Sequence, residues 1–168
     1  MTWTARLLKW VEPEDNPRNT IYGALGTGLV IAAVDPATES YLRVVIATAV
    51  AVATYWLAHG YAHWVGERLR PRAHHGRSAG GLVGALSHEW PLVEGAAIPL
   101  VALLVSWAAG APLTAGVPAA VWTAAAALMV FEIAGGLRRQ LRAWQLLTNA
   151  GIGLVLGGAL LAVKMLLH

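Results

Sequence analysis

Two histidines one helical turn apart, His59 and His63, lie inside a long apolar stretch of the chain. Imidazoles at membrane depth are costly, and two of them at this spacing on one helix can address a single neighbouring point, as paired histidines do in metal sites. Tyr55 and Glu67 continue the four-residue spacing on either side. The pattern predicts a polar site on one face of a membrane helix, with Tyr55 and Glu67 in supporting roles.

Glu94 lies at a similar depth in the next apolar segment. It follows Trp90 by four residues, which is about 6 Å at the helical rise, and Pro99 frees a backbone acceptor beside it. A carboxylate next to a freed carbonyl is suited to bind a cation or water, although a kinked helix with a snorkelling glutamate explains the same residues. His88 and Glu89, just before this segment, are expected to be solvated at the membrane interface.

Glu132 interrupts an otherwise apolar segment, where an ionised glutamate facing lipid would be unstable. We therefore expect it to face the interior of the bundle, either protonated or paired with His59, His63 or Arg138. Asn149 falls at a similar depth in the last apolar segment and is expected to supply hydrogen bonds. The predicted site accordingly consists of His59, His63, Glu94 and Glu132, with Asn149 in support.

The composition excludes several kinds of protein and of chemistry. Apolar residues make up 57% of the 168 residues, charged residues only 12%, and the mean hydropathy is +0.57. Because soluble domains carry about a quarter charged residues, the chain is predicted to be an integral membrane protein. The absence of cysteine excludes disulfides, thiolate ligands and cysteine nucleophiles.

The apolar segments predict an all-α, polytopic membrane protein, with one helical bundle over residues 20–168. Residues 1–19 are predicted to form a cytoplasmic, amphipathic segment that contains a short interfacial helix. The first apolar segment is short for a membrane span, so whether it crosses is left open. The five predicted spans cover residues 20–34, 41–65, 90–109, 117–137 and 143–166.

The positive charges orient this arrangement. Ten of the twelve lysines and arginines fall on one side if the chain crosses five times, and only Arg43 and Lys164 fall on the other. By the positive-inside rule, the N-terminus is cytoplasmic and the C-terminus lies outside. The composition is typical of a bacterial inner membrane protein. The ten residues on the cytoplasmic side are Arg6, Lys9, Arg18, Arg68, Arg70, Arg72, Arg77, Arg138, Arg139 and Arg142.

The predicted partners follow from the same features. The lipid bilayer is the first, and the arginine-rich loops favour contacts with anionic lipids. Glycines at helical spacing, such as Gly153 and Gly157, permit close helix packing within one chain or in a homo-oligomer or membrane complex. The basic isoelectric point reflects these loops, so no nucleic-acid partner is expected.

Three functions fit the predicted site. The first is a pathway for protons or a divalent cation, because histidine and buried glutamate relay protons and also ligate zinc, manganese or iron. The second is a structural subunit in which the polar residues hold helices together. The third is an intramembrane metalloenzyme that acts on lipid, although no HExxH or nucleophile motif is present. The outer halves of the last three spans contain almost no polar residues, which argues against a continuous pathway there.

Overall fold

The computed structural model describes residues 17–69, 81–138 and 143–167, and these residues form helices joined by turns, with no strand among them. The prediction of an all-α protein is therefore confirmed. The predicted interfacial helix near the N-terminus, and the arginines at positions 70–77 and 139–142, lie outside the described residues. The helices are α2 (Pro17–Ala32), α3 (Tyr41–Arg68), α4 (Gly81–His88), α5 (Trp90–Ala108), α6 (Leu113–Arg138) and α7 (Ala143–Leu167).

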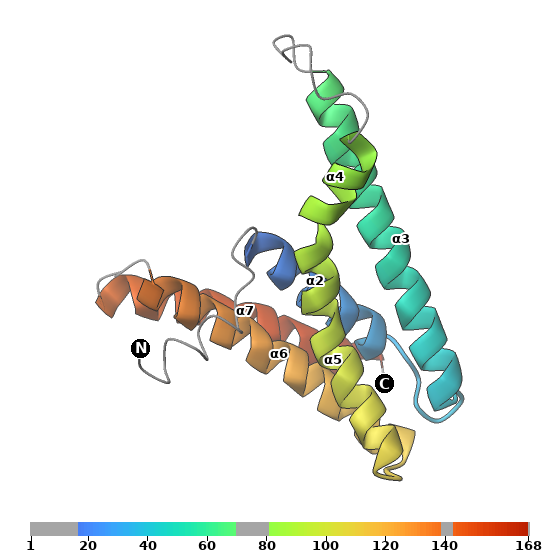
Figure 1. The fold of residues 1–168 in the computed structure, drawn as a ribbon. Coiled ribbons are helices and arrows are strands. Elements are labelled where there is room, and N and C mark those ends of the chain that lie inside the picture. Colours follow the sequence, from blue (N-terminus) through green and yellow to red (C-terminus); the bar gives the residue numbers. More distant parts are fainter. Residues whose placement is uncertain (1–16, 70–80, 139–142, 168) are drawn as a thin grey trace, which may run out of the picture.

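The helices form two groups that meet at α2 and α5 (Figure 1). In the first group, α4 packs along one end of α3, and α5 continues from α4. In the second group, α6 and α7 lie side by side and run across the direction of α5. The short helix α2 packs against α3, α5, α6 and α7, so it occupies the centre of the fold.

Three helical stretches of the described residues are long and apolar enough to cross a membrane, which is compatible with a membrane location. They are Tyr41–Arg68, Gly81–Ala108 and Leu113–Gly135, the second formed by α4 and α5 together. The 16 residues of α2 span about 24 Å, less than the hydrocarbon core of about 30 Å. The number of crossings and the orientation of the chain stay predictions.

Helix α4 was not predicted, because it lies in residues 66–89, between two of the predicted spans. Its sequence is largely apolar, and its residue Leu86 packs against Gly60 of α3. Trp56 of α3 donates its indole N–H to the carbonyl of Leu86 at 3.0 Å. These contacts with α3 stabilise a helix of eight residues that would be marginal alone.

The helices α2 and α5 cross with their backbones in direct contact. A Cβ added to Gly23 would lie 1.9 Å from the carbonyl oxygen of Leu92, and one added to Gly95 would lie 1.9 Å from that of Thr20. Neither site can accept a side chain without moving a helix. The two glycines therefore determine how closely α2 approaches α5, as small residues do where membrane helices pack.

Glycines also bring α6 and α7 together. Gly153 and Gly157 of α7 are buried, and a Cβ on them would lie 3.4 Å from Met129 and 3.0 Å from Ala125, respectively. The predicted close packing of this glycine pair therefore occurs within one chain. The adjacent Gly158 faces no neighbour within 4 Å.

Two polar contacts hold the ends of the helices opposite α4. The Tyr41 hydroxyl donates to the carbonyl of Ala111 at 3.0 Å, and its ring stacks on Trp107 at 5.8 Å. The Lys164 ammonium donates to the carbonyl of Val34 at 2.8 Å, just beyond the end of α2. Lys164 thus satisfies a carbonyl that the helix leaves without a donor.

The α2–α5 crossing makes a testable prediction. Gly95→Ala should lower the free energy of unfolding in detergent by about 1–3 kcal/mol, because the methyl group overlaps the backbone of Thr20. Gly26→Ala is the matched control, since a Cβ there meets nothing within 4 Å. Chemical unfolding followed by circular dichroism measures both variants. Equal stability of the two would show that the crossing tolerates a wider separation.

Candidate metal centre

Three potential metal ligands converge where α3, α4 and α5 meet. His63, His88 and Glu89 each offer a ligand atom, and these atoms lie within 4.8 Å of one another. His63 comes from the last two turns of α3, whereas His88 ends α4 and Glu89 separates α4 from α5. The site therefore depends on the pairing of α4 with α3.

The break between α4 and α5 is encoded by Pro91. Proline lacks a backbone N–H and its ring clashes with the carbonyl four residues earlier, here that of Ser87. Proline is well tolerated in the first turn of a helix, and it stands at that position in α5. The chain therefore changes direction at Glu89, which positions His88 and Glu89 beside His63.

Glu89 is the buried anchor of the site, with only 5% of its surface exposed. One of its oxygens, Oε2, accepts a hydrogen bond from the side-chain amide of Asn19, which is itself buried. The other oxygen, Oε1, lies 3.4 Å from Nδ1 of His63. A buried carboxylate needs such partners, and this arrangement leaves Oε1 as the oxygen that faces the histidines.

His63 lies between two carboxylates, one on each side of its ring. Its Nδ1 faces Glu89, and its Nε2 lies 3.6 Å from Oε1 of Glu67, one turn later on α3. Both distances exceed those of ordinary hydrogen bonds. A histidine that ligates a metal through one nitrogen commonly donates its other N–H to a carboxylate, and Glu67 is placed for that role.

The distances fit a small divalent ion. Two ligand atoms bonded tetrahedrally at about 2.1 Å lie about 3.4 Å apart, which matches the distance between His63 Nδ1 and Glu89 Oε1. The His88 ring centroid lies 5.0 Å from that of His63, and its exposed side chain can rotate to complete the set. Two imidazoles and one carboxylate suit zinc, manganese or iron, and leave at least one coordination position open.

Two tryptophans of α3, Trp56 and Trp64, pack against the neighbouring helices α5 and α4. The Trp56 ring meets that of Trp90 edge to face at 5.9 Å, and Gly81 at the start of α4 packs on Trp64. The guanidinium of Arg68 lies 3.9 Å above the centre of the Trp64 ring. Arg68 is thereby held over an aromatic face in the turn that also carries Glu67.

The four residues predicted to form the site have different surroundings. His63 belongs to the cluster, whereas the half-buried ring of His59 packs edge to face on Tyr55 at 4.4 Å. Glu94 is exposed on α5, and half-buried Glu132 packs beside Gly153 in the α6–α7 interface. Within the described residues, the metal-ligand group includes His63 and none of the other three.

Two supporting residues of the prediction also have definite places. Glu67 pairs with His63, and Tyr55 contacts His59, as the four-residue spacing on one helix implies. Helix α7 includes Asn149, but its side chain is outside the described set, as is that of Arg138. A role for Asn149 in the site stays a prediction.

Sequence reasoning missed His88, Glu89 and Asn19 as members of the site. The prediction that Glu89 is solvated is wrong, because α2 and α3 cover it. Pro91, two residues after Glu89, is typical of the start of a helix, but the helices that cover Glu89 come from distant parts of the sequence. Asn19 was assigned to the N-terminal segment, whereas α2 begins two residues before it, at Pro17.

Comparison of the chain with protein-family models, with curated proteins and with solved structures finds no match. The arrangement of the residues themselves therefore carries the functional argument.

The attachment of α4 to α3 can be tested through a single hydrogen bond. Trp56→Phe removes the indole donor and retains an aromatic ring, so α4 should open more often. A hydrogen bond contributes about 1 kcal/mol, so amide hydrogen exchange in residues 81–88 should accelerate about fivefold. Trp122→Phe, on the exposed face of α6, should leave that exchange unchanged. Unaltered exchange in Trp56→Phe would mean that apolar packing alone holds α4.

Proposed function

We propose that this protein binds one divalent transition-metal ion through His63, His88 and Glu89, and that it serves as a membrane pathway for that ion. The observation that carries the proposal is the convergence of two imidazoles and a buried carboxylate from three helical elements. Two of the three ligands have a neighbour that can orient them, since Asn19 donates to Glu89 and Glu67 faces the far side of His63. Such outer partners orient ligands and raise metal affinity.

The exposure of the ligands favours an ion that enters and leaves. The His63 side chain is 33% exposed and His88 is exposed, whereas Glu89 is buried. A structural metal site is usually closed by four protein ligands, and this group supplies three. Three ligands with exposed imidazoles would allow the ion to exchange with the surrounding solution.

A metal-dependent enzyme acting on a lipid is the second candidate. The observation that favours it is the ligand set, because two histidines and one glutamate leave a position where a metal could activate water. Mass spectrometry of vesicle lipids incubated with the metal-loaded protein separates the two functions. New lipid products would favour the enzyme, and unchanged lipids would favour the pathway.

The ligands can be tested by metal analysis of the purified, tag-free protein supplied with zinc, manganese or iron. Wild type should hold close to one ion per chain. His63→Ala and Glu89→Gln should lose it, because each removes a ligand. Glu67→Gln should bind the same ion about 10- to 100-fold more weakly, as expected for loss of an outer partner.

His59→Ala is the matched control, since it removes a histidine of the same helix that lies outside the ligand group. It should retain the metal, with circular dichroism confirming the helical content of every variant. Loss of metal in His59→Ala would indicate that His59 and His63 together ligate the ion. Wild type that holds no metal would contradict the proposal and leave the cluster as a contact between helices.

A further inference from the structure

The buried polar side chains of the described residues are confined to three helical elements. Glu89 and Asn19 belong to the metal centre, Thr20 and Thr27 follow on α2, and Thr48 lies on α3. Among the described residues of α6 and α7, none is both polar and buried. Thr27 lies eight residues beyond Asn19, which is about 12 Å along α2, and Thr48 lies 15 residues before His63, about 22 Å along α3. The buried polar residues thus extend from the metal centre toward the opposite end of α2 and α3.

The three threonine hydroxyls differ from those elsewhere in the described chain. Thr54, Thr123 and Thr148 each donate to the carbonyl one turn earlier, at 2.8–3.0 Å. The buried hydroxyls of Thr20, Thr27 and Thr48 have no hydrogen-bond partner within the part of the chain that the structure describes. A buried hydroxyl without a partner is unfavourable, and each such case calls for an explanation.

Two cavities lie beside α2, and Thr27 is the one of the three threonines that borders either of them. One of about 240 Å³ lies between α2, α3 and α5, and Thr27 lines it together with Gly26, Ala51 and Tyr55. The second, of about 440 Å³, lies between the end of α2, the following loop and the start of α3. Val30 lines both, so the cavities adjoin. The unpartnered hydroxyl of Thr27 belongs to a residue that is 1% exposed and borders the first cavity.

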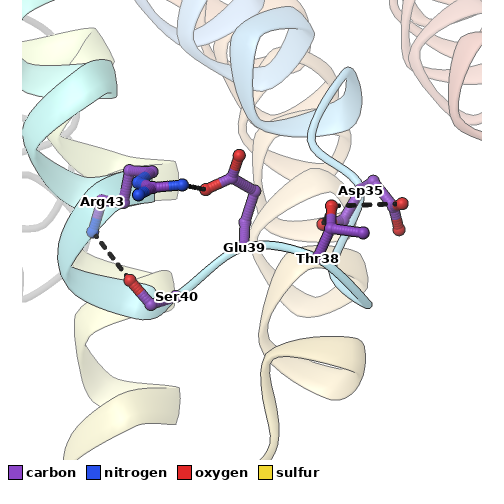
Figure 2. A network of polar contacts seen from close by, with 5 residues as sticks. All are labelled: Asp35, Thr38, Glu39, Ser40 and Arg43. Carbon is purple, nitrogen blue, oxygen red and sulfur yellow. Dashed lines mark hydrogen bonds and ion pairs between the residues drawn. The ribbon is translucent and has the colours of Figure 1, made fainter.

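The second cavity is bordered by acidic residues in the loop between α2 and α3 (Figure 2). The Asp35 carboxylate accepts hydrogen bonds from the backbone of Ala37 at 3.0 Å and from the Thr38 hydroxyl at 3.3 Å. The Glu39 carboxylate pairs with the guanidinium of Arg43 at 3.3 Å. Two cationic groups offset these carboxylates: Arg43 pairs with Glu39, and the Lys164 ammonium donates to the carbonyl of Val34, which borders the same cavity. A metal ion at this end would therefore compete with Arg43 for Glu39.

We infer that the metal ion moves between the centre at His63 and the cavity at Asp35 along the crevice between α2, α3 and α5, past the hydroxyl of Thr27. This inference rests on the proposed function and adds the route. The hydroxyl oxygen of Thr27 replaces part of the hydration shell that the ion loses in the apolar middle of the bundle. Pro99 adds a further acceptor, because it leaves the carbonyl of Gly95 without its helical donor where α5 touches Thr20.

The apolar lining of the first cavity would oppose the passage of an ion while α3 packs against α2. Gly26, Val30, Ala51 and Leu92 offer no charged group, and an apolar constriction excludes ions by dewetting. Transport would then require the loosely packed α3 to move away from α2.

The test uses the full-length protein in vesicles of phosphatidylethanolamine and phosphatidylglycerol loaded with a zinc-sensitive dye, with Zn²⁺ added outside. Thr27→Val keeps the shape of the side chain and removes the hydroxyl. Zn²⁺ influx should fall about tenfold, which corresponds to about 1.4 kcal/mol in the barrier. Thr27→Ser should restore influx, because it retains the hydroxyl. Removal of an unpartnered hydroxyl should also leave the fold at least as stable as wild type.

Two further variants complete the design. Thr123→Val removes a threonine hydroxyl from α6, away from the crevice, and should transport Zn²⁺ as wild type does. Ala51→Leu fills the first cavity from α3 and should reduce influx to that of protein-free vesicles. Metal content at the His63 centre should be unchanged in all of these variants.

The outcomes separate the route from the proposed function. Wild-type influx in both Thr27→Val and Ala51→Leu would overturn the route while leaving a functioning pathway elsewhere in the protein. Wild-type protein that binds Zn²⁺ but admits it no faster than protein-free vesicles would overturn both the route and the transport function. Metal binding at His63, His88 and Glu89 would then be the part of the proposal that is retained. Loss of influx together with loss of metal from the His63 centre in Thr27→Val would also overturn the route, since the defect would then arise in binding.

Discussion

The direct contact between the backbones of α2 and α5 is the constraint on which the rest of the structure depends. Gly23 and Gly95 permit this contact, because neither has a Cβ to separate the helices. The close approach holds Asn19, at the start of α2, beside Glu89, at the start of α5, so that a carboxylate can be buried with a donor. Helices α2 and α5 thereby form two sides of the first cavity, and α3 forms the third side. A wider crossing would separate Asn19 from Glu89 and expose the carboxylate.

The candidate metal centre depends both on local sequence and on contacts between residues far apart in the chain. Pro91 interrupts the regular helix at Glu89, where two candidate ligands, His88 and Glu89, follow each other in the chain. The third ligand, His63, is 25 residues earlier on α3, and α4 must pack back against α3 to meet it. Trp56 and Gly60 provide that packing. The chemistry of the site therefore depends on a helix of eight residues whose stability comes from its neighbour.

Much of the fold could be predicted from the sequence. Long apolar segments predicted the helices at 41–65, 90–109 and 143–166 to within a few residues, because hydrophobic length is a strong signal for membrane helices. The four-residue spacing also identified His63 and its neighbour Glu67, since residues one turn apart on a helix must share a face. Helix α4 escaped notice because it is short and follows an arginine-rich linker, a context in which local patterns resemble those of a loop.

The sequence by itself determined that this protein is helical and apolar, and that His63 belongs to a polar face, because these properties depend on composition and on spacing within one helix. Only the tertiary structure decided which polar residues meet. It buried Glu89, which was expected to be solvated, beneath Asn19 and His63. It placed Glu132 in the α6–α7 interface and left Glu94 exposed, although these two were predicted to lie at a similar depth. The physical reason is that depth along a helix follows from residue number, whereas the neighbour of a side chain depends on the rotation and crossing of helices. Those are set by contacts between distant residues, such as Gly23 with Leu92 and Gly95 with Thr20.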